Sequence, residues 1–169
     1  MHRFIIRRVN TDDAKHLIDL FRALSDDFSP PLADRTDINL WVEKLLKHGS
    51  GYVAESPSQA LSGACFCYCN HQETKIAHLT ILAVAPEARA PGLGQGLGKA
   101  LFERTLRHCW QSGMRSAEGR YDSKKPRQID FYKRHFGASE IDGGRADRYE
   151  GAIFMSIDLV KRYNTEPQS

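Results

Sequence analysis

The sequence predicts a single domain of the α/β (α+β) class, with a mixed central sheet of about six to seven strands and about four flanking helices. Three observations predict this class: strand-length apolar runs occur beside helical patterns, three strand-like runs follow one another through hairpin-sized connectors, and helices alternate with strands after a glycine-rich loop. The expected order is βααβββαβαβ, with a further strand near Ala138–Ile141. We expect this domain to span residues 1–160 and residues 161–169 to form a C-terminal tail.

The first part of the chain predicts one strand followed by two helices. Phe4–Val9 has the composition of a strand, and Thr11 is a suitable N-cap for the helix that follows. That helix is predicted from four apolar residues at helical spacing: Leu17, Leu20, Phe21 and Leu24. Ser29-Pro30-Pro31 ends it, and a second helix is predicted over Asp37–Lys47.

The rest of the chain predicts three strands in a row and then an alternation of helices and strands. The three strands are Tyr52–Glu55, Leu61–Cys69 and Ile76–Val84, and their short connectors favour antiparallel pairing. After the glycine-rich loop we expect a helix through Trp110, a strand near Ser116–Tyr121, a helix over Pro126–Phe136 and a final strand over Ala152–Leu159. The turn signal Asp142-Gly143-Gly144 precedes that last strand, and residues from Tyr163 onward are expected to form a loose end.

Composition narrows the class of protein. The 169 residues have a net charge of +3 with acids and bases interleaved, so the basic stripe that nucleic-acid binding requires is missing and no nucleic-acid partner is expected. An apolar run of about 18 residues is also missing, so we expect no membrane partner. The first residues carry too many charges for a signal peptide, and four cysteines without an export signal favour reduced thiols in the cytoplasm.

Three of the four cysteines alternate along one predicted strand. Cys65, Cys67 and Cys69 would share one face of it, with Phe66 and Tyr68 on the other. Thiols about 7 Å apart on an extended strand cannot complete a tetrahedral site by themselves. We therefore expect these thiols to pack as small buried groups and expect no metal site.

The glycine-rich segment Arg89–Lys99 carries the strongest functional signal. It lies between an apolar strand and a helix, where glycines let the backbone approach a ligand and the helix start presents free N–H groups to a phosphate. A Walker A loop would need glycine at Leu93 and a hydroxyl group at Ala100, and neither is present. A dinucleotide fingerprint would need glycine at Leu97 or Lys99, so that motif is missing too.

This segment resembles the acetyl-CoA loop of the GCN5-related N-acetyltransferases (GNAT family), Arg/Gln-x-x-Gly-x-Gly/Ala. The preceding run Leu82–Glu87 and the later run Ile129–Gly137 are also similar to that family, and in this order the three segments are a specific signature. The resemblance implies the GNAT fold, acetyl-CoA as cofactor, and direct transfer of an acetyl group to an amine within a ternary complex. It also implies that the strand beside the loop contributes main-chain contacts to the cofactor.

The loop fits the family pattern in two registers. Arg89, Gly92 and Gly94 match its letters, whereas Gly94–Leu101 match its helix start, with Gly94–Lys99 as the expected phosphate cradle. We favour the second register, because the first places two glycines inside the helix at a cost of about 1 kcal/mol each. The expected cofactor-binding residues from both registers and the neighbouring strand are Leu82, Ala83, Val84, Arg89, Gly92, Gly94, Gln95, Gly96, Leu97, Gly98 and Lys99.

Acetyl transfer to an amine needs a proton acceptor for the amine and a proton donor for the leaving thiolate. The resemblance maps the family's usual acid, a tyrosine on the penultimate helix, onto Tyr132; the alternative is that Tyr132 packs in the core with Ile129 and Phe136. His78 is our choice of base, because histidine titrates near neutral pH, although histidines in strands are more often structural. The asparagine that commonly opens this helix in the family is replaced by Lys125 or Ser123.

The acceptor is expected to be a primary amine of a small molecule or peptide. Parts of the chain resemble the diamine-acetylating branch of the family, but the acidic positions of that branch are occupied here by Thr80 and Ile81. Asp26, Asp27 and Asp34 are other acids that could attract a cationic amine. Relatives are often homodimers. The alternative function is a regulatory or partner-binding module that holds coenzyme A without turnover.

Overall fold

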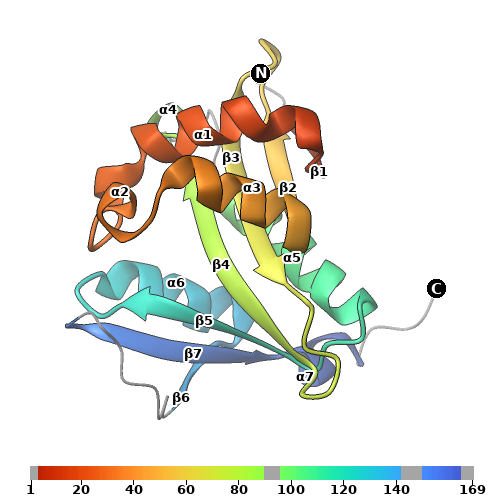
Figure 1. The fold of residues 1–169 in the computed structure, drawn as a ribbon. Helices are drawn as coiled ribbons and strands as arrows, with labels where there is room; N and C mark the ends of the chain where they lie inside the picture. The colour runs from red at the N-terminus through yellow and green to blue at the C-terminus, as the bar shows by residue number, and fades with distance from the viewer. Residues whose placement is uncertain (1–3, 90–95, 142–149, 165–169) are drawn as a thin grey trace. The chain divides into compact units, whose positions relative to one another are not determined.

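The structure, a computed structural model that describes residues 4–89, 96–141 and 150–164, confirms the predicted mixed sheet flanked by helices (Figure 1). Seven strands follow the order β1-β2-β3-β4-β5-β7-β6. Four α-helices in the described residues have ten or more residues, as expected, and three more, of four or five residues, were not predicted. Contacts divide the chain into two compact units, residues 1–67 with 81–105 and residues 68–80 with 106–169.

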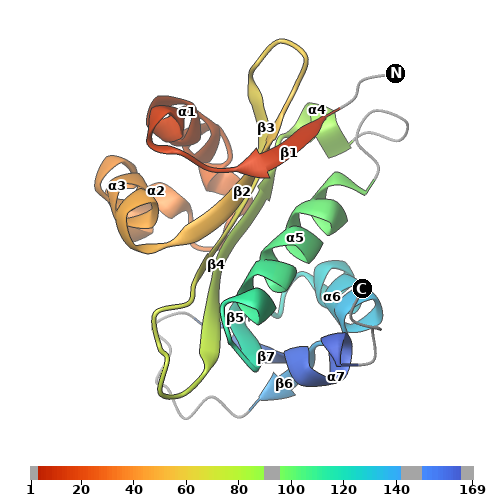
Figure 2. The ribbon, with the colours of Figure 1, turned by 90° about the vertical axis from the view of Figure 1, so that its right-hand side faces the viewer.

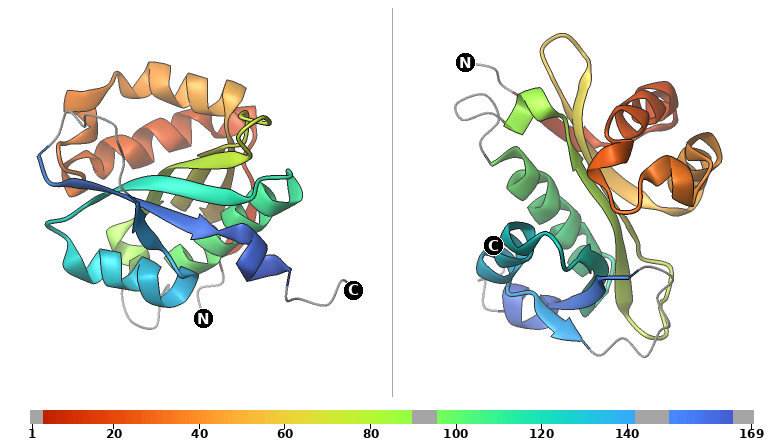
Figure 3. Two further views of the ribbon diagram at one scale, coloured as in Figure 1. Left: turned by 90° about the horizontal axis from the view of Figure 1, so that it is seen from below. Right: turned by 90° about the vertical axis from the view of Figure 1, so that its left-hand side faces the viewer.

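The first unit joins three antiparallel strands to the helices of the N-terminal half. Its elements are β1 (Ile5–Arg8), η1 (Thr11–Asp13), α1 (Ala14–Ala23), η2 (Ser25–Asp27), α2 (Leu32–Arg35), α3 (Ile38–His48), β2 (Ser50–Glu55), β3 (Leu61–Tyr68) up to Cys67, the end of β4 (Ile76–Val84), α4 (Pro86–Arg89) and the start of α5 (Leu97–Gln111). β1 pairs with β2, and β2 pairs with β3; both pairs are antiparallel. For β2 and β3, this confirms the pairing that their short connector predicted. Helices α1 and α3 cover one face of these strands, and the start of α5 covers the other (Figures 2 and 3).

Strand β3 is buried on both faces, and its side chains alternate as the sequence predicted. Phe66 points toward α1, where its ring lies 6.4 Å from that of Phe21. Phe21 also packs against Trp41 of α3 at 5.4 Å between ring centroids. Cys65 lies on the opposite face, next to Thr105 of α5. Two helical layers therefore enclose this strand.

The predicted N-cap Thr11 is wrong by one residue. Asn10 is the cap: its side-chain oxygen accepts a hydrogen bond from the Asp12 N–H at 2.9 Å, and the Asp13 carboxylate accepts one from the Asn10 N–H at 2.9 Å. An amide oxygen satisfies the first N–H groups as well as a hydroxyl does. Thr11 instead begins the 3₁₀ turn η1.

Arg7 joins β1 to β2 and to the turn before α1. Its guanidinium donates to both oxygens of Asp13, at 2.7 and 2.9 Å, and to Glu55 at 2.8 Å. Asp13 is buried, and the Arg7 hydrogen bonds hold the pKa of its carboxyl group below its usual value, against the opposing effect of burial. This cluster fixes the entry of the chain into α1.

The second unit packs β5 (Ser116–Asp122), β6 (Ser139–Ile141) and β7 (Ala152–Asp158) with α6 (Pro126–Phe136), α7 (Leu159–Tyr163) and the remaining parts of β4 and α5. β5 is parallel to β4 and antiparallel to β7, which also pairs with β6 (Figure 3, left). The extra strand expected near Ala138–Ile141 is thus confirmed. Helix α6 has its predicted bounds because Pro126 begins it and Gly137, at φ 66°, ends it in the left-handed conformation.

We expected a loose C-terminal end starting at Tyr163, and this prediction is wrong for Tyr163 itself. Tyr163 ends α7 and is buried, and its ring stacks on Trp110 at 6.0 Å between centroids. Asp158 caps this short helix by accepting the Lys161 N–H at 2.9 Å. The turn signal Asp142-Gly143-Gly144 lies outside the described residues. None of the described helices has the length and apolarity needed to cross a membrane.

We predict that Asp13→Asn lowers the free energy of unfolding by roughly 2 kcal/mol at pH 7, because Arg7 loses a charged acceptor. The folded-state pKa of Asp13 is lowered, so its stabilisation is complete above the usual carboxyl value and is lost as pH falls through the folded-state value. Urea unfolding of both proteins between pH 7 and pH 3 should show the difference shrinking in acid. Asp12→Asn removes the same charge at an exposed neighbour and should change stability little; an equal loss there would contradict the prediction.

Candidate functional site

Helix α5 begins directly after Gly96, which has a φ of 89°. That conformation suits glycine and turns the chain sharply into the helix, whose first bond runs from the Ala100 N–H to the Gly96 carbonyl at 2.8 Å. The N–H groups of Leu97, Gly98 and Lys99 lie in the first turn, where an α-helix offers them no partner of its own. Such a helix start, with the positive end of its dipole, attracts phosphate groups.

Glycines lie at two contacts between α5 and the strands. A Cβ on Gly98 would lie 3.5 Å from Val84 Cγ2 and 3.9 Å from Leu82 Cδ2, so the first turn rests on the end of β4. A Cβ on Gly63 of β3 would lie only 2.8 Å from Leu101 Cδ1 and 3.1 Å from the Ala83 carbonyl oxygen. Position 63 therefore has no room for a side chain.

The end of β4 presents main-chain groups on one edge. The Ala83 carbonyl faces Gly63 of β3, and the Ala85 N–H donates to Ser62 of the same strand at 2.8 Å. Since carbonyl directions alternate along a strand, the main-chain groups of Leu82 and Val84 face the other edge. The ladder of β4 with β5 runs only from Ile76↔Ser116 to Leu79↔Gly119, so it stops before this segment.

Arg89, a predicted phosphate contact, interacts with the protein itself. Its Nε donates to the Val84 carbonyl at 2.7 Å, and its Nη2 lies 2.7 Å from the Asp27 carboxylate. Both side chains are about half-exposed. Arg89 therefore joins the end of β4 to η2, which is one of the acidic segments considered for the acceptor amine.

The two predicted catalytic residues both belong to the second unit. His78 is a half-buried residue of β4, and its ring lies edge-on to that of His71, 5.1 Å between centroids. Tyr132 of α6 is only 5% exposed and lies 4.7 Å from the Tyr121 ring and 6.3 Å from the Phe136 ring. The structure thus places Tyr132 in an aromatic cluster, as the core alternative expected, while leaving its catalytic role a prediction.

Tyr121 is a neighbour of Tyr132 that the sequence analysis did not consider. A Cβ on Gly119 would lie 3.2 Å from the Tyr121 hydroxyl oxygen and 3.3 Å from Leu79 Cβ, so this phenol lies over β5 where its pairing with β4 ends. An aromatic residue in a strand gives no functional signal by itself. Gly92, Gly94 and Gln95 of the predicted loop lie outside the described residues.

Comparisons with known proteins agree with this fold. The model of the acetyltransferase (GNAT) family matches residues 17–138. A GNAT-family acetyltransferase structure from Staphylococcus aureus MU50 is similar with a TM-score of 0.73 and 16% identity, covering 93% of this chain and 99% of that one. A spermidine N-acetyltransferase chimaera from Vibrio cholerae and hSSAT is similar with a TM-score of 0.71 and 17% identity, covering 95% of this chain and 98% of that one.

An acetyltransferase from Streptococcus agalactiae gives a TM-score of 0.70 with 19% identity, covering 92% of this chain and 98% of that one. At these identities the solved structures establish the fold alone. A comparison with curated protein sequences finds no match.

We predict that Gly63→Ala destabilises the protein by about 1–3 kcal/mol, because the added methyl group overpacks against Leu101 and the Ala83 carbonyl. Gly98→Ala is the matched control: its methyl group would make ordinary contacts in a helix, so the stability should be unchanged or slightly higher. Thermal unfolding followed by circular dichroism distinguishes the two variants. Equal midpoints for both would show that α5 does not rest on β3 as closely as described.

Proposed function

Because the chain belongs to the acetyltransferase (GNAT) family, we propose that it transfers an acetyl group from acetyl-CoA to a primary amine of a small molecule or peptide. The observation that carries the proposal is the first turn of α5 resting on Leu82 and Val84, beyond the last paired residues of β4 and β5. A diphosphate at the helix start and an amide-bearing arm along the strand would both find partners there. The proposed cellular location is the cytoplasm.

The residues of this segment fit coenzyme A by their chemistry. Gly96 and the N–H groups of Leu97, Gly98 and Lys99 would hold the diphosphate, and the position of the helix start at Leu97 favours the register Gly94–Lys99. The outward main-chain groups of Leu82 would bind the amides of the pantetheine arm. Val84 contributes its N–H group, because its carbonyl already accepts from Arg89.

In the proposed reaction the neutral amine attacks the thioester carbonyl directly, a C–N bond forms, and the C–S bond breaks. His78, or a water molecule that it orients, takes the proton that the amine loses. The Tyr132 phenol gives its proton to the departing sulfur and regains one from solvent.

The η2 and α2 region is the proposed source of acceptor selectivity. Asp27 is paired with Arg89, whereas Asp26 and Asp34 are exposed acids of the same region. Their carboxylates would draw a cationic amine toward the protein before it loses its proton. The similarity to a spermidine N-acetyltransferase chimaera makes polyamines a reasonable first part of an acceptor panel.

The reaction is tested by measuring thiol release from acetyl-CoA across a panel of diamines, arylalkylamines, amino sugars and peptide N-termini. We predict that Tyr132→Phe lowers kcat by roughly a hundredfold through loss of the proton donor, and that His78→Ala lowers it by about tenfold. Tyr163→Phe is the matched control, since Tyr163 is as buried as Tyr132. A Tyr132→Phe rate within twofold of wild type would remove Tyr132 as the acid; binding of coenzyme A without turnover on any amine would favour the regulatory module.

Arg89 has a separate test. If Arg89 contacts the phosphates of the bound cofactor, Arg89→Ala should raise the KM for acetyl-CoA roughly tenfold but leave the reaction with a short acetyl thioester lacking phosphates unchanged. Asp27→Asn releases Arg89 without removing its charge and should not raise that KM. Equal losses with both thioesters would mean that Arg89 acts only through the fold.

A further inference from the structure

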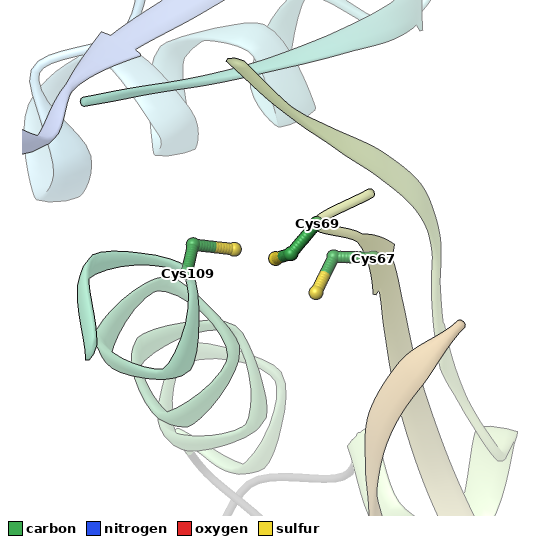
Figure 4. Close-up of side chains that lie close together, drawn as sticks. All are labelled: Cys67, Cys69 and Cys109. Atoms are coloured by element: carbon green, nitrogen blue, oxygen red, sulfur yellow. The ribbon is translucent and has the colours of Figure 1, made fainter. Parts of the chain in front are cut away.

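Three cysteine thiols gather where β3 ends beside α5 (Figure 4). Cys69 and Cys109 belong to the same compact unit, and Cys67 precedes Cys69 by two residues on the chain. The three Sγ atoms all lie within 4.8 Å of one another, and the four cysteines of the chain are present as thiols. Figure 4 shows the sulfur atoms of Cys69 and Cys109 pointing toward each other.

This arrangement corrects the expectation of widely spaced strand thiols. The strand predicted to reach Cys69 ends at Tyr68, so Cys69 lies beyond the regular pleat and its sulfur turns toward that of Cys67. The third thiol comes from a helix about 40 residues later in the chain, which strand periodicity alone does not indicate. The reason given for expecting no metal therefore does not apply to this cluster.

We propose that Cys67, Cys69 and Cys109 form a binding site for one soft, thiophilic cation of the Cu(I) type. A metal in the plane of three sulfurs, about 2.3 Å from each, requires sulfur–sulfur separations of about 4 Å. The described positions allow this with small side-chain rotations. Two opposed sulfurs alone, as in Cys69 and Cys109, would also suit a two-coordinate soft ion.

The ligand set favours a soft cation over zinc. Within the described residues the group consists of three cysteines, with no histidine or carboxylate as a fourth member. Structural zinc sites take four ligands, whereas thiolates by themselves select Cu(I) and related ions. Calcium and magnesium need oxygen ligands, which this group does not offer.

Burial supports the same conclusion. Cys67 and Cys109 are fully buried, whereas Cys69 is half-exposed and gives a cation access from solvent. Each thiol that binds must release its proton to solvent, so occupancy should increase with pH. A bound soft cation would offset the cost of forming thiolates in this dry environment.

Cys65 provides a matched control on the same strand. It is as buried as Cys67 but is no member of the cluster, and it lies next to Thr105 on α5. Burial raises the pKa of the Cys65 thiol to about 12, with the Thr105 hydrogen bond opposing the shift. Cys65 should therefore stay a protonated thiol under conditions in which the cluster binds metal.

The test is an anaerobic titration of the full chain with Cu(I), followed by the ultraviolet charge-transfer absorption of copper–thiolate bonds and by proton release in weak buffer. We expect one tightly bound ion per chain, at least a hundredfold weaker binding for Cys69→Ser and Cys109→Ser, and wild-type binding for Cys65→Ser. Circular dichroism checks that each variant is folded. Cys69→Ser, at a half-exposed position, should fold even if Cys109→Ser does not.

Three results would overturn the proposal. One is the lack of a saturating charge-transfer band in the wild type, and another is an equal loss of binding in Cys65→Ser. The third is rapid formation of a Cys69–Cys109 disulfide in air, seen as a loss of two hydrogens by mass, together with unchanged stability on adding Cu(I). That result would make the pair a redox couple instead.

Discussion

The close approach of α5 to the strands beneath it is the constraint on which the candidate site depends. It exists because position 63 has no side chain: Gly63 leaves room for Leu101 and the Ala83 carbonyl, and the first helical turn rests on Leu82 and Val84. A side chain at position 63 would move the helix away from the strands, and the proposed diphosphate and its attached arm could then not contact both elements at once. The packing at Gly63 and the proposed chemistry therefore depend on the same close approach of helix and strands.

Much of the fold could be predicted from the sequence, because its signals are local. The bounds of β4 and α6 were predicted to the residue: one is an apolar run between polar turns, and the other starts with Pro126 and ends before Gly137. The short helices α2, α4 and α7 were missed, since four or five residues are too few for a helical period to show. The N-cap was misplaced for a different reason. Asn10 and Thr11 are both common N-cap residue types, and only the hydrogen bonds of the structure distinguish them.

The candidate site was predictable only in part. The helix start and its strand follow from the glycine pattern, whereas Tyr132 and His78 were chosen by family resemblance and by side-chain chemistry. The Arg89–Asp27 pair joins residues 62 positions apart, and no local sequence pattern predicts it. The same holds for Cys109 beside Cys69, which depends on which elements the topology brings together.

The aromatic packing has a practical consequence. The chain has two tryptophans, and each compact unit contains one: Trp41 beside Phe21 in the first, and Trp110 stacked on Tyr163 in the second. Replacing either by phenylalanine leaves a single tryptophan, whose selectively excited fluorescence reports on one unit. Fluorescence of the two single-tryptophan proteins during denaturation would then reveal whether the units melt together or one before the other.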